Sequence, residues 1–190
     1  DHKFRAIDIK SGTVVWSYDG VEGYIETKPL VYDNLVIFGA WDKNLYALDK
    51  KTGKEVWKWH EGKPGRFYSA AAVWPVAANG KVFIADPERA LTAIDASTGK
   101  TVWRTKESMV RDSTTTDFPE KIWASNVGFG YEHAPSMPVE KEGVVFGSTK
   151  NGLMFGLDAH TGKVLWKHKV GNSLISTLVP LSKNKCLFTA

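Results

Sequence analysis

Cysteine is nearly absent from this chain of 190 residues, in which Cys186 is the single example. One cysteine excludes a disulfide bond within the chain. Long apolar runs are missing as well, so no segment is predicted to cross a bilayer as a helix. The sequence also lacks the HExxH, CxxC and Gly-x-Ser-x-Gly motifs and a phosphate-cradling glycine loop. We therefore assign no catalytic residue and no metal ligand from the sequence.

Charge is also not concentrated in any one segment. The 25 Lys and Arg residues outnumber the 21 Asp and Glu residues, for a formal net charge of +4. The basic residues are spread through expected turns, as at Lys50, Lys51 and Lys163, without a compact run. Nucleic-acid binding needs basic side chains clustered on one face. We interpret these charges as a solvated surface and predict no nucleic-acid partner.

What the sequence does contain is a repeat. An Asp is followed four residues later by Gly, and after four more by Trp. The four copies, for which we predict structural roles, are Asp8, Gly12 and Trp16; Asp49, Gly53 and Trp57; Asp95, Gly99 and Trp103; and Asp158, Gly162 and Trp166. Successive Asp residues lie 41, 46 and 63 residues apart. The first two spacings match a propeller blade of roughly 40–50 residues, and the third indicates an insertion.

Each copy of the repeat predicts two strands joined by a tight turn. Apolar and small residues alternate before Asp49, and a second alternating run at 55–59 follows Gly53. Gly53 fits the left-handed position of a bulged hairpin turn. Asp49 can accept hydrogen bonds from the turn amides. We expect Trp57 to lie flat against the neighbouring sheet and to bury roughly 150–250 Å².

Two further strand-like runs precede each complete copy of the repeat. They are 29–32 and 35–39, then 73–77 and 82–85, then 138–140 and 144–147. Four short antiparallel strands are the composition of one propeller blade. The sequence thus predicts an all-β fold, a β-propeller of four-stranded antiparallel blades with four blade-equivalents and one blade split between the termini.

The predicted domain is a single β-propeller or an arc of one. Its expected parts are a half-blade at 1–19, blades at 24–60, 68–105 and 133–168, a half-blade at 173–190, and an inserted loop at 106–132. Three interpretations of the split blade stay open: an excised arc of a larger ring, a four-bladed ring closed on itself, or a ring completed by self-association with a second copy. An open arc leaves strand edges unpaired.

The string Ala/Leu-x-Asp-x-x-Thr-Gly-Lys-x-x-Trp resembles the PQQ-like, quinoprotein-type β-propeller repeat with its tryptophan-docking motif. The same repeat is found in PQQ-dependent dehydrogenases and in the outer-membrane β-barrel assembly lipoprotein. The resemblance implies a periplasmic or other extracytoplasmic location. It also implies two functions: a non-catalytic scaffold, or a fragment of a quinoprotein dehydrogenase that binds PQQ and calcium.

The residues favour the first of these functions. The dehydrogenases of this family place a vicinal cysteine pair, a stacking Trp and a Glu/Asn/Asp calcium set around the cofactor. Trp123, Asn126 and Glu132 are available here, but the cysteine pair is absent. A calcium ion takes six to eight oxygen ligands, and no compact acidic cluster supplies them. We expect no cofactor, with PQQ and calcium as the alternative.

The inserted loop and its neighbours are expected to open on one face of the disk. The candidate binding residues on this face are Arg66, Tyr68, Arg111, Trp123, Asn126, Tyr131, Glu132 and His133. Aromatic and Arg side chains suit recognition, and the same aromatic residues also suit a plug that closes the disk. Neighbouring residues of a strand point to opposite faces, so Glu132 and His133 are poor catalytic partners. We predict a scaffold that binds a protein or a small ligand here, as the recognition module of a larger protein.

Overall fold

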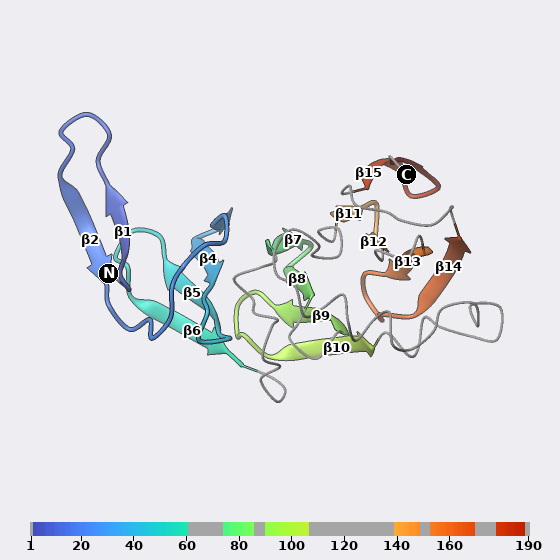
Figure 1. Cartoon of the computed structure of the whole chain (residues 1–190), viewed down its shortest axis with the longest axis horizontal. Helices are drawn as coiled ribbons and strands as arrows, with labels where there is room; N and C mark the ends of the chain where they lie inside the picture. The colour runs from blue at the N-terminus through green and yellow to red at the C-terminus, as the bar shows by residue number, and fades with distance from the viewer. Residues whose placement is uncertain are drawn as a thin grey trace.

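The structure is a computed structural model of the whole chain. It describes residues 2–60, 74–85, 90–106, 139–148, 153–169 and 178–188. Within these ranges all the regular elements are β-strands, and none is a helix. The strands form antiparallel sheets that follow one another along the chain (Figure 1). The predicted all-β propeller fold is confirmed.

Three of the sheets are complete four-stranded blades. The first blade contains β3 (Leu30–Tyr32), β4 (Leu35–Gly39), β5 (Leu45–Asp49) and β6 (Glu55–Trp59). The second contains β7 (Val76–Ala78), β8 (Lys81–Ala85), β9 (Ala90–Asp95) and β10 (Thr101–Lys106). The third contains β11 (Val139–Lys141), β12 (Val144–Ser148), β13 (Leu153–Asp158) and β14 (Val164–Lys169).

Two hairpins flank these blades, and each is a two-stranded sheet. The N-terminal hairpin is β1 (Phe4–Ile7) and β2 (Val14–Tyr18), and the C-terminal hairpin is β15 (Val179–Ser182) and β16 (Lys185–Leu187). In Figure 1 the three blades form a row, with the N-terminal hairpin at one end of it and the C-terminal hairpin beside the third blade.

The first strands of the second and third blades extend further toward their turns than the sequence predicted. β7 ends at Ala78 rather than at 77, and β11 ends at Lys141 rather than at 140. Each strand pairs right up to a two-residue turn, with Ala78 opposite Lys81 and Lys141 opposite Val144. Both turn residues have positive φ, 50° and 73° in the first turn and 53° and 80° in the second. This backbone twist matches the twist of the strands and lets the ladder continue to the turn.

The repeat's Asp organises the turn between the third and fourth strands. Oδ1 of Asp49 accepts hydrogen bonds from the backbone N–H groups of Lys51 (3.0 Å) and Thr52 (2.8 Å) and from the Thr52 hydroxyl (2.8 Å). Gly53 closes the turn at φ 71°, and the strand register shifts beside it. The predicted bulged turn is therefore confirmed. The corresponding Asp residues accept bonds in the same pattern in the other copies.

The Asp carboxylates of these four turns make the stability of the fold depend on pH. The Thr52 hydroxyl, followed by its backbone N–H, lowers the pKa of Asp49 below its ordinary value of 3.8, and the other three turn carboxylates shift the same way. A carboxyl whose pKa is lower in the folded state stabilises the fold above the unfolded pKa, and this contribution is lost as the pH falls through the folded pKa. We expect urea midpoints that decline below about pH 4 as these carboxylates are protonated.

The variant Asp49→Asn serves as the control, because it keeps the oxygen acceptor and removes one titrating group. Its urea midpoint is expected to fall less steeply below about pH 4 than that of the unchanged chain. Equal acid dependence in the two proteins would contradict this role of the turn carboxylate.

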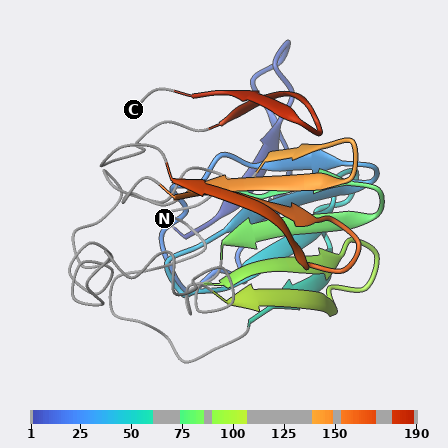
Figure 2. The ribbon, with the colours of Figure 1, turned by 90° about the vertical axis from the view of Figure 1, so that its right-hand side faces the viewer.

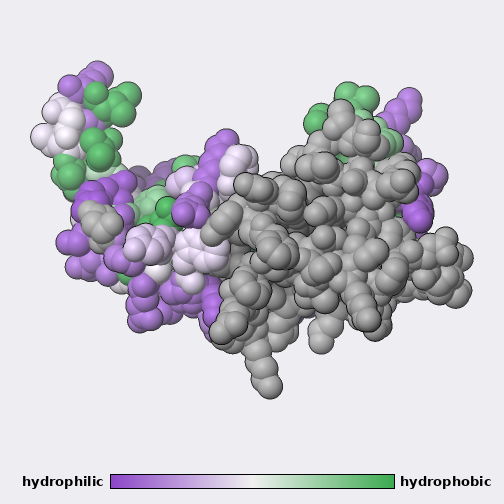
Figure 3. Space-filling view, viewed as in Figure 1, coloured by the Kyte–Doolittle hydropathy of each residue, from purple (hydrophilic) through white to green (hydrophobic). Residues whose placement is uncertain are grey.

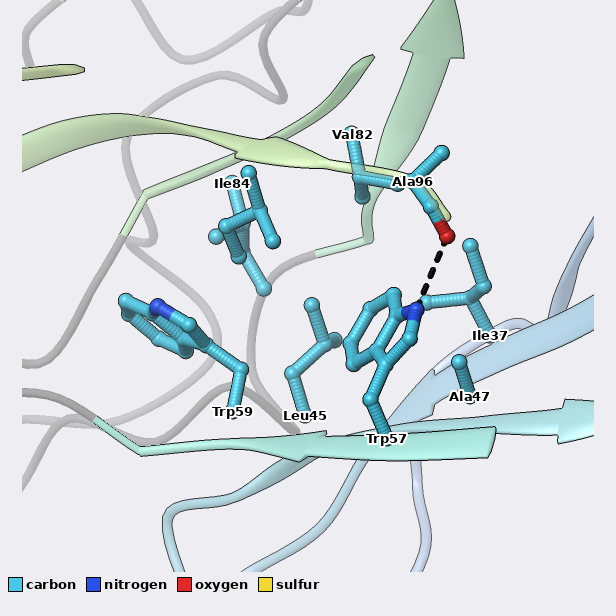
Figure 4. Packing of buried hydrophobic residues seen from close by; sticks show 9 residues of the cluster. Ile37, Leu45, Ala47, Trp57, Trp59, Val82, Ile84 and Ala96 are labelled. Atoms are coloured by element: carbon cyan, nitrogen blue, oxygen red, sulfur yellow. Dashed lines mark hydrogen bonds between the residues drawn. The ribbon is translucent and has the colours of Figure 1, made fainter. Parts of the chain in front are cut away.

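Each blade is joined to the next by the indole of the repeat's Trp. Nε1 of Trp57 donates to the Ala96 carbonyl oxygen at 2.8 Å across the interface between the first and second blades (Figure 4). The indole lies against Gly99, where an added Cβ would come within 2.7 Å of the ring. The core around it is a single apolar layer shared by both blades, made of Ile37, Leu45, Ala47, Trp57, Trp59, Val82, Ile84, Ile94 and Ala96.

Candidate binding face

The two ends of the strands in each blade lie on opposite sides of the row. Figure 2 shows the hairpin turns of the blades gathered along one side of the molecule. Because neighbouring strands are antiparallel, the connections from a second to a third strand and from one blade to the next leave from the other side. We call that other side the connection face.

The predicted binding residues lie outside the described residues. This applies to all eight, Arg66, Tyr68, Arg111, Trp123, Asn126, Tyr131, Glu132 and His133, and to the predicted inserted loop after residue 106. Their assignment stays a prediction. The predicted structural residues of the four repeats are all described, in the turns and fourth strands given above.

On the connection face, the turn between β4 and β5 is fixed by Asp42. Its carboxylate accepts hydrogen bonds from the backbone N–H groups of Glu22 and Asn44, each at 3.0 Å, and from the Tyr46 hydroxyl at 2.6 Å. Burial raises the pKa of Tyr46, and the bond to Asp42 raises it further. The phenol therefore stays protonated and donates. With three donors on its carboxylate, Asp42 anchors the turn.

A histidine on this face is also held in the same network. Nδ1 of His60, at the end of β6, lies 3.0 Å from Oδ1 of Asn44, and the Asn44 side chain is buried. Asn44 Nδ2 in turn lies 3.4 Å from the Tyr46 hydroxyl. The histidine side chain thus links the fourth strand to the turn between the second and third strands, which stiffens this part of the face.

Three aromatic residues belong to or contact the segment that follows the N-terminal hairpin. We call them the aromatic strip: Tyr24, Trp41 and Trp74. The backbone N–H of Trp41 donates to the Tyr24 carbonyl oxygen at 2.9 Å, and its indole donates to Glu26 at 3.0 Å. The ammonium of Lys28 lies 5.7 Å from the centre of the Trp74 ring. The segment that follows the N-terminal hairpin therefore connects all three residues.

Two members of the aromatic strip are exposed, and Trp41 is half-buried. Tyr24 is 65% exposed and Trp74 is 46% exposed. Sequence reasoning missed Trp41 and Trp74. The sequence gives little indication that these two tryptophans belong to a binding face. Each is an isolated aromatic residue next to a turn or a proline and is not part of the repeat. Exposed, oriented aromatic side chains are typical anchors of protein interfaces.

The described residues do not fit a calcium site. Within these ranges, no group of three or more His, Cys, Asp or Glu side chains is arranged to hold a metal ion. The described part of the chain likewise contains no helix long and apolar enough to cross a membrane.

Four-stranded antiparallel blades, bulged Asp-x-x-x-Gly turns and indoles that bridge from blade to blade define a β-propeller of PQQ-like repeats. The family model described as outer membrane protein assembly factor BamB matches residues 1–118 and 117–189. The chain belongs to this family.

Individual relatives show the same relationship. The outer membrane protein assembly factor BamB of Yersinia pestis is 25% identical over 167 residues, which cover 88% of this chain and 39% of that protein. The quinoprotein alcohol dehydrogenase PedH of Pseudomonas putida is 38% identical over 87 residues, which cover 40% of this chain and 14% of that protein. The chain therefore spans much less than the full length of these relatives.

A solved structure extends the comparison to the fold. The crystal structure of BamB from Moraxella catarrhalis matches 95% of this chain and 47% of its own chain, with a TM-score of 0.64 and 17% sequence identity. The arrangement of the blades is thus that of about half of a longer propeller chain.

Proposed function

We propose that this chain is a non-catalytic propeller scaffold that binds a protein partner through its connection face. The observation that carries the proposal is the aromatic strip, in which Tyr24 and Trp74 are exposed. Trp41 is hydrogen-bonded to Glu26, and Trp74 is covered by the ammonium of Lys28. The family membership and the similarity to BamB over most of the chain support a role in outer membrane protein assembly. An extracytoplasmic location is part of the same proposal.

The strip suits a protein partner for a physical reason. Binding orders side chains that are mobile in the free protein, and this ordering costs about 0.5–1.5 kcal/mol for each flexible side chain. The bond from Trp41 to Glu26 and the contact of Lys28 with Trp74 restrict these aromatic groups before any partner arrives. The partner therefore gains buried aromatic area at a low entropic cost.

The double variant Tyr24→Ala/Trp74→Ala tests the proposal. We expect it to weaken partner binding by about 30-fold or more, which corresponds to the loss of about 2 kcal/mol at an interface anchor. The melting temperature is expected to change little, because both side chains are substantially exposed. Binding is measured by biolayer interferometry against purified proteins of outer membrane assembly, immobilised one at a time.

The control is Val56→Ala/Val102→Ala, which removes two valines that are 48% and 45% exposed in fourth strands away from the strip. It is expected to leave binding unchanged. The variant Trp123→Ala/Tyr131→Ala examines the predicted loop in the same assay. Equal effects of the strip variant and the valine control would refute the strip as the binding site.

A quinoprotein dehydrogenase fragment is the second candidate, favoured by the 38% identity to PedH over 87 residues. PQQ supplies redox chemistry when it is bound in such enzymes, but the described residues offer no cluster that fits its calcium ion. A thermal-shift titration with PQQ and Ca²⁺ separates the two functions. A ligand at about 100 times its dissociation constant stabilises a protein by roughly 2.7 kcal/mol, so saturable stabilisation would favour the second candidate.

A further inference from the structure

The two-residue turn between β7 and β8 is made of Asn79 and Gly80. Ala78 pairs with Lys81 directly on either side of it, and the two turn residues have φ 50° and 73°. Asn followed by Gly is a favoured pair for this left-handed type of turn. The pair therefore suits the conformation of the turn, and it also reacts in a characteristic way.

Asparagine is a chemically labile residue, because its side-chain amide can be lost to the backbone that follows it. The nitrogen of the next residue attacks Cγ, the Cγ–Nδ2 bond breaks, and the leaving amide takes up the proton of the attacking N–H and departs as ammonia. Water then opens the cyclic imide, at Cγ to give aspartate or at the backbone carbonyl carbon to give isoaspartate. No electrons are transferred, and water is the only co-reactant. A following glycine favours the first step, because it has no Cβ to obstruct the approach.

The turn is accessible to the water that this reaction requires. Asn79 and Gly80 are both exposed. A Cβ added at Gly80 would meet no atom within 4 Å, so the space around the attacking nitrogen is open on that side. The neighbouring first blade presents mainly hydrophilic side chains on the face shown in Figure 3, which fits a surface that stays in contact with water.

A tyrosine of the neighbouring blade holds the attacking nitrogen. The backbone N–H of Gly80 donates to the Tyr32 hydroxyl oxygen at 2.8 Å. Tyr32 ends β3 of the first blade, and its ring packs against the apolar layer that the first and second blades share. The nitrogen can attack only after this bond has opened and the proton has been removed. The packing of one blade on the other thus controls the reactivity of the turn.

We propose that Asn79-Gly80 is a site of spontaneous deamidation whose rate is set by the hydrogen bond from Gly80 to Tyr32. While the first and second blades are packed together, the Tyr32 hydroxyl keeps the Gly80 nitrogen out of the reaction. When the blades separate locally, the bond opens and the nitrogen becomes available. The extent of conversion at Asn79 therefore reports how often this interface opens.

The two products have different effects on the turn. The first position of the corresponding turn is Asp33 in the first blade and Glu142 in the third, so a carboxylate is compatible with this backbone. Isoaspartate instead lengthens the main chain by one methylene and displaces the polar groups of Gly80. The bond to Tyr32 and the bond from the Ala96 N–H to the Gly80 carbonyl oxygen (2.9 Å) would both be disrupted. Formation of isoaspartate thus prevents this edge of the interface from closing again.

The variant Tyr32→Phe tests the restraint, because it removes the hydroxyl and keeps the packed ring. The unchanged chain and the variant are incubated in the folded state at mildly alkaline pH, which favours removal of the amide proton. Peptide mapping by mass spectrometry follows aspartate and isoaspartate at position 79 over time. We expect conversion about 2–10-fold faster in the variant, the factor that corresponds to one hydrogen bond. Equal rates would overturn the role of Tyr32.

Asn34 is the reference within the same samples. It stands in the corresponding turn of the first blade, but Leu35 follows it, and its side-chain amide donates to Asp49. A bulky residue after the asparagine obstructs the attack, so Asn34 is expected to remain unconverted while Asn79 reacts. Conversion of Asn79 no faster than that of Asn34 would overturn the deamidation site. In the chain unfolded in urea, Asn79 is expected to react faster than in the folded chain, and an equal rate would refute the restraint by the fold.

The control Val145→Ala separates loss of the bond from a general loss of stability. Val145 is fully buried in β12 of the third blade, so its truncation destabilises the chain without touching the turn. It is expected to leave the conversion of Asn79 close to that of the unchanged chain. Equal acceleration by Tyr32→Phe and Val145→Ala would show that general loosening exposes the turn, and would overturn specific control by Tyr32.

Discussion

Replacement of Trp57 by alanine is expected to lower the free energy of unfolding by about 3–5 kcal/mol. Trp57 is 6% exposed, packs between the first and second blades, and donates a hydrogen bond to the Ala96 carbonyl oxygen. Alanine leaves a cavity in the shared apolar layer and a buried carbonyl oxygen without its donor, and both effects destabilise the fold. For a chain of this size the melting temperature should fall by roughly 6–20 °C.

The neighbouring variant Val56→Ala is the matched control for this experiment. Val56 lies in the same strand but is 48% exposed, so its loss is expected to change stability by only about 0.5 kcal/mol. Urea denaturation of the two variants beside the unchanged chain gives the comparison. Similar losses from Trp57→Ala and Val56→Ala would show that the indole does not hold the blades together.

Gly99→Ala is expected to destabilise the chain by about 1–3 kcal/mol more than Gly80→Ala. Both glycines have a left-handed backbone, with φ 71° and 73°, so both variants carry the same conformational strain. They differ in their surroundings. An added Cβ at Gly99 would come within 2.7 Å of the Trp57 ring, whereas one at Gly80 would meet nothing within 4 Å. The difference therefore measures how closely the indole must approach the turn.

The two variants are compared by their midpoints in urea at equal protein concentration. A shift in the fluorescence of the tryptophans in Gly99→Ala, absent in Gly80→Ala, would report the displaced ring directly. Equal destabilisation would mean that the ring moves aside at no cost, and the packing of the blades would then have to depend on other contacts in the layer.

The conserved positions within the repeat have two separate roles, one in the local turn and one in the packing between blades. The Asp and Gly form a turn that needs only local hydrogen bonds and a left-handed residue. The Trp acts at a distance, because its acceptor lies 39 residues away for Trp57 and 56 residues away for Trp103. Local strand and turn formation can therefore survive a variant that separates the blades.

The predicted positions of the strands and turns depended on short-range signals and were mostly confirmed. Alternating apolar residues marked the strands, and the Asp and Gly spacing marked the bulged turns. The first strands of the second and third blades were placed one residue short of their turns, because their short runs carry little pattern. The turns at Asn79-Gly80 and Glu142-Gly143 follow these strands, and only the paired backbone shows how far each strand continues.

The candidate binding face was less predictable. Trp41 and Trp74 belong to no repeat, and each contacts the segment that crosses from the N-terminal hairpin to the first blade. The network of Asp42, Tyr46 and His60 likewise joins residues of a turn and two strands. Such groups meet only after the blade has formed, so spacing along the sequence does not reveal them.

By itself the sequence determined the repeat, and through it the four-stranded blades, their bulged turns and the family. The physical reason is that each of these depends on residues within a few positions of one another. Tertiary structure decided what each tryptophan of the repeat packs against. Trp57 and Trp166 stand in nearly identical local sequences, yet one docks on the next turn and the other borders an apolar hollow. The difference lies in the neighbour that packs against each indole, and that neighbour comes from a distant part of the chain.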